Sequence, residues 1–132
     1  MPALDPHVWQ RLLLLAIAGA LGTLARYGLG GLVQRIAPAS FPWGTFAVNA
    51  LGCLMFGIVW SLAEERALIS GRTRIILLIG FMGAFTTFST FAFETGQLLA
   101  DSQWLLVAGN MLLQNAVGIG LLLAGIALGK LV

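Results

Sequence analysis

The sequence predicts an all-α integral membrane protein in which four transmembrane helices form a single domain over residues 1–132. Composition is the first reason: 59% of the residues are hydrophobic and only 9% are charged, whereas soluble domains carry about 25% charged residues. Length is the second reason, because a helix needs roughly 20 residues to cross a bilayer. The third is that the apolar residues are gathered in four long runs, so lipid is the natural solvent of this chain.

The expected spans cover residues 12–33, 44–63, 75–99 and 104–128. Turn-forming residues such as Pro38, Ser40 and Pro42 separate the first two runs. Polar residues 64–74 separate the second from the third, and residues 101–103 separate the third from the fourth. Tryptophan side chains favour the headgroup level of a membrane, and those near the expected span ends are Trp9, Trp43, Trp60 and Trp104.

Charge and chemistry exclude several classes of function. The basic residues stand singly near the ends of the apolar runs, as in membrane proteins, and they form no stripe for nucleic acid. Cys53 is the single cysteine, so an internal disulfide is impossible. The sequence shows no nucleophile–base pair, metal-ligand cluster or phosphate loop, so we expect a protein that is not an enzyme and whose partner is membrane lipid.

Small residues four apart let helix backbones approach closely in lipid. The pairs of this kind are Ala18/Gly22, Gly80/Ala84, Ala116/Gly120 and Gly125/Gly129. They are explained either by tight packing within one chain or by contact between two chains. We favour a dimer, because four thin helices can barely enclose a pathway alone.

Polar residues inside the spans indicate where function resides, because each is unfavourable in lipid unless it is paired or hydrated. Arg26 lies in the first span, where it either snorkels to the interface or supplies positive charge to a pore vestibule, and the two roles are compatible. Asn49 lies in the middle of the second span. Its amide either bonds another helix or donates to an anion.

The densest polar run lies inside the third span, from Gly83 to Glu94. Its glycine, serine and threonine residues lower helix propensity, and irregular backbone at membrane depth is tolerated only where it is buried or lines a cavity. We therefore expect a break in the third helix, with carbonyls free to coordinate a cation.

Side chains of the same run are spaced to share helix faces. Phe88 and Phe91 are three residues apart and lie on one face, while Thr87, Thr90 and Glu94 share a neighbouring face. Plain packing of phenylalanine and hydroxyl bonds back to the helix are the alternative explanation. The density of the run makes that alternative weak.

Three motifs together resemble the Fluc (CrcB) family of fluoride channels. They are Gly44-Thr45 followed by Val48-Asn49, the Thr-Thr-Phe-Ser-Thr-Phe run at residues 86–91, and Arg26-Tyr27 in the first span. The resemblance extends over all four spans, and its most specific part is the Thr-Phe-Ser-Thr-Phe run with the upstream Gly-Thr-x-x-Val-Asn.

The resemblance implies roles for individual residues. Phe88 and Phe91 correspond to phenylalanines whose ring edges line the fluoride path, and Asn49 corresponds to the pore asparagine. Gly83 and Thr86 match the broken-helix positions whose carbonyls hold a structural sodium ion, the one cofactor that we expect. The remaining correspondences are the hydroxyl-rich segment of Thr87, Ser89 and Thr90, the acidic residue Glu94 and the vestibule residue Arg26.

The fourth span departs from the family pattern. Asn110 and Gln114 are four residues apart and share a helix face, from which they either donate to a permeating anion or tie helices together. Gln114 stands where a small hydroxyl residue is common, and Asn110 where a Tyr or His is common. Both replacements can donate hydrogen bonds, so both are included in the expected fluoride pathway.

The resemblance also implies an antiparallel homodimer in the bacterial inner membrane that lets cytoplasmic fluoride leave down its gradient. Dual insertion requires a nearly balanced distribution of Lys and Arg. One side has Arg35, with Arg26 nearest to it, and the other side has Arg11, Arg66, Arg72, Arg74 and Lys130. This bias leaves room for a chain of fixed orientation with an inverted paralogue as its partner.

The main alternative is a small multidrug or cation exporter of dual topology, which is also a dimer of four-span chains. That chemistry requires a carboxylate within the membrane for proton exchange, and Glu94 is the only acidic candidate deep in a span. A further alternative, an assembly subunit without transport, leaves the polar run of the third span unexplained.

Overall fold

The computed structural model describes residues 7–132, which form helices joined by short connections and contain no strand within that range. The first two spans are the continuous helices α1 (Val8–Ile36) and α2 (Trp43–Glu64). The third comprises α3 (Gly71–Ile75), the π-helical η1 (Ile76–Met82), α4 (Gly83–Phe85) and α5 (Phe88–Ala100). The fourth comprises α6 (Trp104–Leu112), the π-helical η2 (Leu113–Val117) and α7 (Gly118–Leu131).

Four helical segments are long and apolar enough to cross a membrane, which confirms the predicted number of spans and the all-helical, multi-pass class. They are Val8–Ile36, Trp43–Glu64, Gly71–Ala100 and Trp104–Leu131. Each extends a few residues beyond the predicted apolar run at one or both ends. The polar residues that flank a span can continue its backbone hydrogen bonds, so apolar character underestimates helix length.

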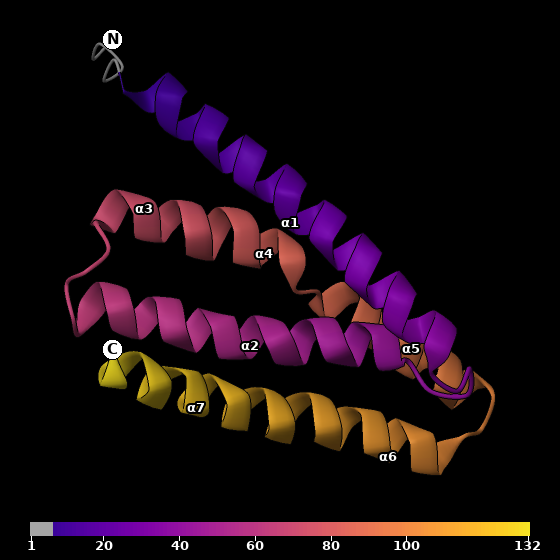
Figure 1. Cartoon of the computed structure of the whole chain (residues 1–132). Coiled ribbons are helices and arrows are strands. Elements are labelled where there is room, and N and C mark those ends of the chain that lie inside the picture. The colour runs from indigo at the N-terminus through magenta and orange to yellow at the C-terminus, as the bar shows by residue number, and fades with distance from the viewer. Residues whose placement is uncertain (1–6) are drawn as a thin grey trace, which may run out of the picture.

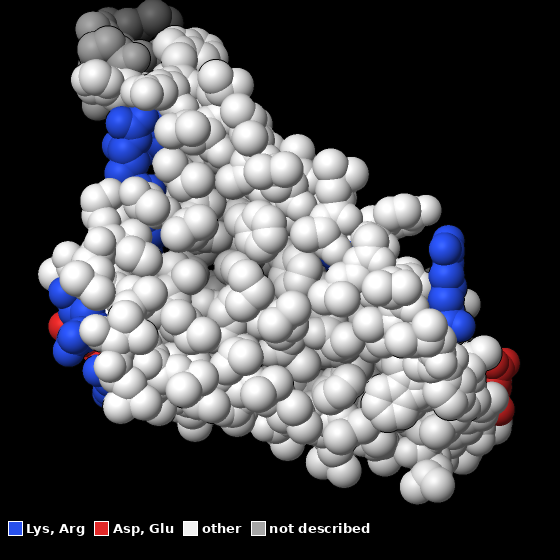
Figure 2. Space-filling view, viewed as in Figure 1, with Lys and Arg blue, Asp and Glu red and all other residues white. Residues whose placement is uncertain are grey.

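Successive spans run in opposite directions, so the start of α1, the α2–α3 connection and the end of α7 lie toward one end of the bundle (Figure 1). The α1–α2 and α5–α6 connections lie toward the other end. Charged side chains gather at these two ends on the face seen in Figure 2, and the surface between them is almost entirely uncharged. This distribution suits a bundle whose middle lies in hydrocarbon.

The most extensive helix contact joins α2 to α7, which lie side by side in Figure 1. A Cβ atom added at Gly57 would overlap the Leu122 carbonyl oxygen, and one added at Gly125 would overlap the Leu54 carbonyl oxygen. The two backbones are therefore in contact. The predicted Gly125/Gly129 pair thus packs within the chain, because glycine alone leaves room for such an approach.

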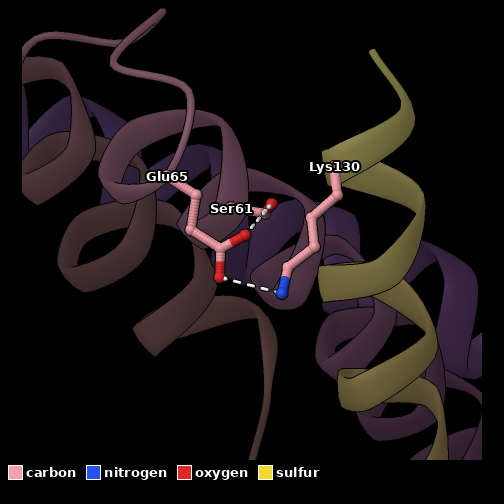
Figure 3. Close-up of polar contacts among 3 residues, drawn as sticks. All are labelled: Ser61, Glu65 and Lys130. Atoms are coloured by element: carbon pink, nitrogen blue, oxygen red, sulfur yellow. Dashed lines mark hydrogen bonds and ion pairs between the residues drawn. The ribbon is translucent and has the colours of Figure 1, made fainter.

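Polar side chains join the same two helices at one end of the bundle (Figure 3). Lys130 Nζ lies 3.3 Å from Glu65 Oε1, and the fully buried Ser61 donates from Oγ to Glu65 Oε2 at 3.3 Å. Beside them, Arg74 of α3 forms an ion pair with Glu64. These contacts connect the ends of three spans through side chains.

A second small-residue contact joins α1 to the first half of the third span. A Cβ at Gly22 would overlap the Phe81 carbonyl oxygen, and the Cβ of Ala18 lies 2.9 Å from the Cβ position at Gly80. By contrast, beyond the neighbouring turns of its own helix, no atom of the described chain lies within 4 Å of the Cβ position at Gly120. Of the predicted small-residue pairs, Ala116/Gly120 therefore faces away from this chain.

Two residues of extended backbone, Thr86 and Thr87, lie between α4 and α5. Thr86 keeps contact with the preceding turn, because its N–H and its hydroxyl both donate to the Met82 carbonyl oxygen at 3.0 Å. Thr87 caps α5, since its Oγ1 accepts from the Thr90 N–H at 3.2 Å. Threonine suits this place because it has low helix propensity and is a good N-cap residue.

Candidate functional site

Three adjoining grooves follow the polar residues of α2, α5 and the fourth span. The inner groove has a volume of about 390 Å³ and contains Asn49, Thr87, Phe88, Phe91 and Gln114 among its lining. The middle groove has a volume of about 250 Å³ and contains Arg26, Thr45, Thr87, Thr90 and Glu94. The outer groove, of about 340 Å³, contains Gln34, Glu94, Gln97, Asp101 and Gln103.

Shared lining residues make these three grooves neighbours in a row, which we call the route. Thr87 lines both the inner and the middle groove, and Gln34 and Glu94 line both the middle and the outer groove. The route begins beside Asp101 and Gln103, in the turn between α5 and α6, and leads to the extended backbone at Thr86 and Thr87. Polar side chains thus line a path from one end of the bundle to membrane depth.

Asn49 holds the extended backbone from the neighbouring helix. Its Oδ1 accepts from the Thr87 N–H at 2.8 Å, and its Nδ2 donates to the Thr87 carbonyl oxygen at 3.1 Å. The same Nδ2 donates to Gln114 Oε1 at 3.0 Å. The amide therefore satisfies main-chain groups that have no helical partner, which at membrane depth would be strongly unfavourable if left unpaired.

Glu94 is held by the hydroxyl of Thr45, which donates to its Oε1 at 2.7 Å. The second oxygen, Oε2, is buried and accepts no hydrogen bond from the described residues. Oε2 can therefore bind a proton, a water molecule or a cation where the middle and outer grooves meet.

Arg26 reaches the end of α4 rather than the membrane surface alone. Its Nε donates to the Ala84 carbonyl oxygen at 3.0 Å, and the side chain also lines the middle groove. A cation is favourable at the C-terminal end of a helix, where carbonyl oxygens lose their helical partners. Arg26 therefore caps the first half of the third span and also places a positive charge on the route.

The two predicted phenylalanines both lie in the inner groove. Their ring centroids are 5.6 Å apart with an interplanar angle of 61°, an edge-to-face arrangement. Phe91 is half-buried, whereas Phe88 is 78% exposed in the single chain. Phe88 consequently stands at the open side of the groove, where lipid or a second chain would cover it.

Two of the predicted pathway residues lie outside the three grooves. Asn110 is fully buried, and its Nδ2 donates to Thr95 Oγ1 at 2.9 Å, while Thr95 itself donates to the Phe91 carbonyl oxygen at 2.8 Å. Asn110 therefore ties α6 to α5 behind the groove. Ser89 is exposed, with its hydroxyl 3.4 Å from Thr87 Oγ1.

Thr45, Gln34 and Thr95 are site residues for which sequence reasoning had assigned no role. Thr45 could have been found from its spacing, because it is four residues before Asn49 and so shares its helix face. Gln34 bonds the Phe41 carbonyl oxygen and the Gly44 N–H across a turn, and Thr95 bonds Asn110. Those two contacts join different elements and leave no local signal.

The fold and the grooves together define a class: a multi-pass membrane protein in which polar side chains line a route into the bilayer. Such an arrangement is that of an ion channel or a transporter. Within the described residues, no group of three or more His, Cys, Asp or Glu side chains could hold a metal ion.

Comparison with known proteins is more specific. Residues 13–126 match the family described as CrcB-like protein, Camphor Resistance (CrcB). The chain is 56% identical over 125 residues to a Nitrosococcus oceani protein named fluoride-specific ion channel FluC, covering 95% of this chain and 100% of that protein. A protein of the same name from Nitratidesulfovibrio vulgaris (Miyazaki F) is 57% identical over 126 residues, covering 93% and 99%.

A third protein of that name, from Desulforapulum autotrophicum, is 51% identical over 123 residues and covers 93% of this chain and 98% of its own length. The chain belongs to the CrcB family, which confirms the resemblance drawn from the sequence motifs. Since the family is one of ion channels, the prediction that the protein is not an enzyme is also confirmed.

Proposed function

We propose that the protein is a fluoride-selective channel whose pathway follows the three grooves. The observation that carries the proposal is the inner groove, where two phenylalanine rings and uncharged amide and hydroxyl groups line one space. Relatives that cover nearly the whole chain are named for fluoride conduction, which supports the same ion here.

Neutral donors and ring edges suit fluoride in particular. The ion is small and strongly hydrated, so a pore must replace its water without binding it too tightly to release. Phenylalanine rings carry a positive edge, so Phe88 and Phe91 can face an anion without a full charge. The inner groove also adjoins the N-terminal end of α5, and the partial positive charge of a helix N-terminus favours an anion.

The remaining polar residues have roles along the same route. The hydroxyls of Ser89 and Thr90 supply donors beside the first turn of α5, where Thr87 donates its own hydroxyl proton to Thr90 Oγ1. Arg26 supplies positive charge in the middle groove. Glu94, at the boundary with the outer groove, accepts from Thr45 and orders the donors around it. Asn110 contributes indirectly, by holding Thr95 and α5 in place.

A structural sodium ion fits the end of the first half of the third span. The backbone turns away from helical geometry at Thr86, and Gly83, which has no side chain, is exposed on the surface of the single chain. The carbonyls of Met82 and Ala84 are already acceptors, and we assign the hard cation to those of Gly83 and Thr86 on either side of the turn. Sodium would supply positive charge that ties two copies of this backbone together.

The channel is proposed to be an antiparallel dimer, because the single chain leaves its pathway open at the side. Phe88 is 78% exposed and Tyr27 is 82% exposed, and the Ala116/Gly120 pair faces outward. A second chain covering these residues would close the inner groove. A homodimer is the simplest assembly, and an inverted paralogue is the alternative that the distribution of Arg and Lys permits.

In the cell, such a channel would lie in the bacterial inner membrane and carry cytoplasmic fluoride outward down its electrochemical gradient. Passive export is consistent with grooves lined mainly by uncharged donors, because conduction needs sites that an ion can leave as easily as it enters.

The test is anion efflux from liposomes that contain the purified full-length protein, with fluoride and chloride measured by ion-selective electrodes. We expect rapid loss of fluoride and none of chloride above protein-free liposomes. Equal loss of both ions would remove selectivity from the proposal, and no loss of fluoride in a preparation shown to be dimeric would contradict conduction itself.

The exporter alternative depends on one observation, the buried Oε2 of Glu94, which has no hydrogen-bond partner among residues 7–132. It predicts uptake of a cationic dye driven by a proton gradient, and loss of that uptake in Glu94→Gln. Fluoride efflux that continues without any proton gradient would exclude this alternative, because exchange requires the carboxylate to load and release a proton.

A further inference from the structure

The Asn49 amide has no donor left for a ligand. Its Nδ2 donates to the Thr87 carbonyl oxygen at 3.1 Å and to Gln114 Oε1 at 3.0 Å, and an amide nitrogen carries only two hydrogens. Its Oδ1 accepts from the Thr87 N–H at 2.8 Å. The side chain that sequence reasoning assigned to the anion is therefore occupied on both of its polar atoms.

The backbone of Thr87 decides which way both amides point. A main-chain N–H can only donate and a carbonyl can only accept, so these two groups orient the Asn49 amide without ambiguity. Asn49 Nδ2 then requires an acceptor, and Gln114 turns Oε1 toward it and Nε2 away. The main-chain N–H and carbonyl of Thr87 thus fix the orientation of the Asn49 amide, which in turn fixes the orientation of the Gln114 amide.

The group presented at that far end is a donor. Gln114 Nε2 is buried and has no hydrogen-bond partner in the described part of the chain, and Gln114 lines the inner groove together with Phe88 and Phe91. A buried N–H without a partner is unfavourable. Gln114 also lies in the π-helical η2, and such turns are frequent at functional sites.

We infer that Gln114 Nε2 is the side-chain donor that meets the anion in the inner groove, and that Asn49 is a positioning residue that orients it. The inference rests on the proposed fluoride conduction, and it adds a physical reason why the inner groove favours anions over cations. If the hydrogen bonds from Thr87 through Asn49 to Gln114 ran in the opposite direction, Gln114 would present its carbonyl oxygen, which repels an anion. The inner groove is therefore set for anions by main-chain geometry at Thr87.

The first experiment compares fluoride efflux from liposomes containing full-length wild type, Gln114→Met, Gln114→Glu or Gln10→Met. Gln10 is exposed on α1 and gives the matched control, which we expect to conduct at the wild-type rate. Loss of a hydrogen bond to a charged group predicts a decrease of at least about tenfold in Gln114→Met. Gln114→Glu places an acceptor where the donor was, so we expect a decrease of about 100-fold or more.

Asn49→Asp tests the positioning role. Aspartate still accepts from the Thr87 N–H but cannot donate to Gln114, which then turns Nε2 toward the carboxylate and presents Oε1 to the groove. We expect efflux to fall as far as in Gln114→Glu, and the double variant Asn49→Asp/Gln114→Glu to lose little more, because coupled residues are not additive. Additive losses would overturn the positioning role.

A spectroscopic readout separates ion contact from folding. In ¹⁵N-labelled wild type in lipid nanodiscs, the side-chain NH₂ signal of Gln114, assigned by its absence in Gln114→Met, should shift with added fluoride but not with chloride. The Asn49 signal should shift less. If the Gln114 signal does not shift with fluoride and Gln114→Met shows normal efflux, the inference is overturned. The proposed function still holds in that case if the wild type conducts fluoride. A wild type that conducts no fluoride overturns both.

Discussion

Helix α2 has two faces that serve opposite purposes. One face carries Gly57 and Ser61, and it meets α7 so closely that a Cβ atom at Gly57 would overlap a backbone oxygen. The other face carries Thr45 and Asn49, and it meets α5 through side-chain hydrogen bonds beside open grooves. The first contact leaves no space, and the second leaves space for an ion.

The difference follows from lipid as a solvent. Apolar helices gain nothing by leaving apolar surroundings, so their association depends on close backbone packing and on hydrogen bonds. The glycine face supplies the close packing and so stabilises the pair α2–α7. The polar face can then remain partly open, because the stability of the bundle does not depend on filling it.

The largest expected effect comes from breaking the glycine face. In Gly125→Leu the new side chain would meet the backbone of Leu54 and Ile58, and backbone atoms cannot move aside as side chains do. We expect loss of the folded chain, measured as aggregation on size-exclusion chromatography and loss of protein recovered from membranes.

The matched control for that change is Gly120→Leu, because no other helix of the described chain comes within 4 Å of the Cβ position at Gly120. This variant should retain the helical content of the wild type by circular dichroism, whether or not two chains still associate. Equal recovery of folded Gly125→Leu and Gly120→Leu would show that the α2–α7 contact does not support the fold.

The next effect comes from changing the open face without disturbing the tight one. Phe88→Ile and Phe91→Ile remove the positive ring edge while keeping apolar bulk in the inner groove. We expect each to lower fluoride efflux by about 100-fold or more while the dimer elutes at its wild-type volume. Normal efflux from both variants would remove the aromatic rings from the conduction path.

Withdrawal of sodium should have an intermediate effect. If carbonyls of Gly83 and Thr86 hold sodium, prolonged dialysis against sodium-free buffer of equal ionic strength should lower fluoride efflux by about tenfold, because metal binding is coupled to the folded arrangement. Restoring sodium should restore efflux, and potassium at the same concentration should not. Indifference to long sodium depletion would count against this site.

How much of this fold the sequence predicts depends on whether a feature is local. The four spans and the Gly125/Gly129 contact follow from hydropathy and from spacing along one helix. The partners of Asn49 do not, because Thr87 and Gln114 lie 38 and 65 residues away along the chain. No pattern within a single helix specifies which distant backbone an amide will bond.

Asn110 and Gln114 illustrate the same limit within one span. Their spacing of four residues predicts a shared face, yet Asn110 turns to the half-buried Thr95 and Gln114 turns to the inner groove. The span changes from α-helix to π-helix at Leu113, and a wider turn alters which way the following side chains point. The α-helical period therefore could not separate a tie between helices from a groove residue.

The smallest expected effect lies at the surface end of the tight face, where Lys130 and Glu65 form an ion pair (Figure 3). Both side chains are more than one third exposed, at 55% and 39%, and exposed pairs contribute below about 1 kcal/mol. Because glycine packing already joins α2 to α7, Lys130→Gln should leave fluoride efflux unchanged. It should lower the thermal unfolding midpoint in detergent only slightly, by a few degrees or less, since about 1 kcal/mol corresponds to roughly 4 °C in a chain of this size.

Ser61→Ala is the complementary change, because it removes a fully buried donor to the same carboxylate without altering charge. Unfolding monitored by tryptophan fluorescence would measure both. If either variant lowered the unfolding midpoint more than Gly125→Ala does, the polar contacts at the end of the bundle, rather than the glycine packing, would hold the two helices together.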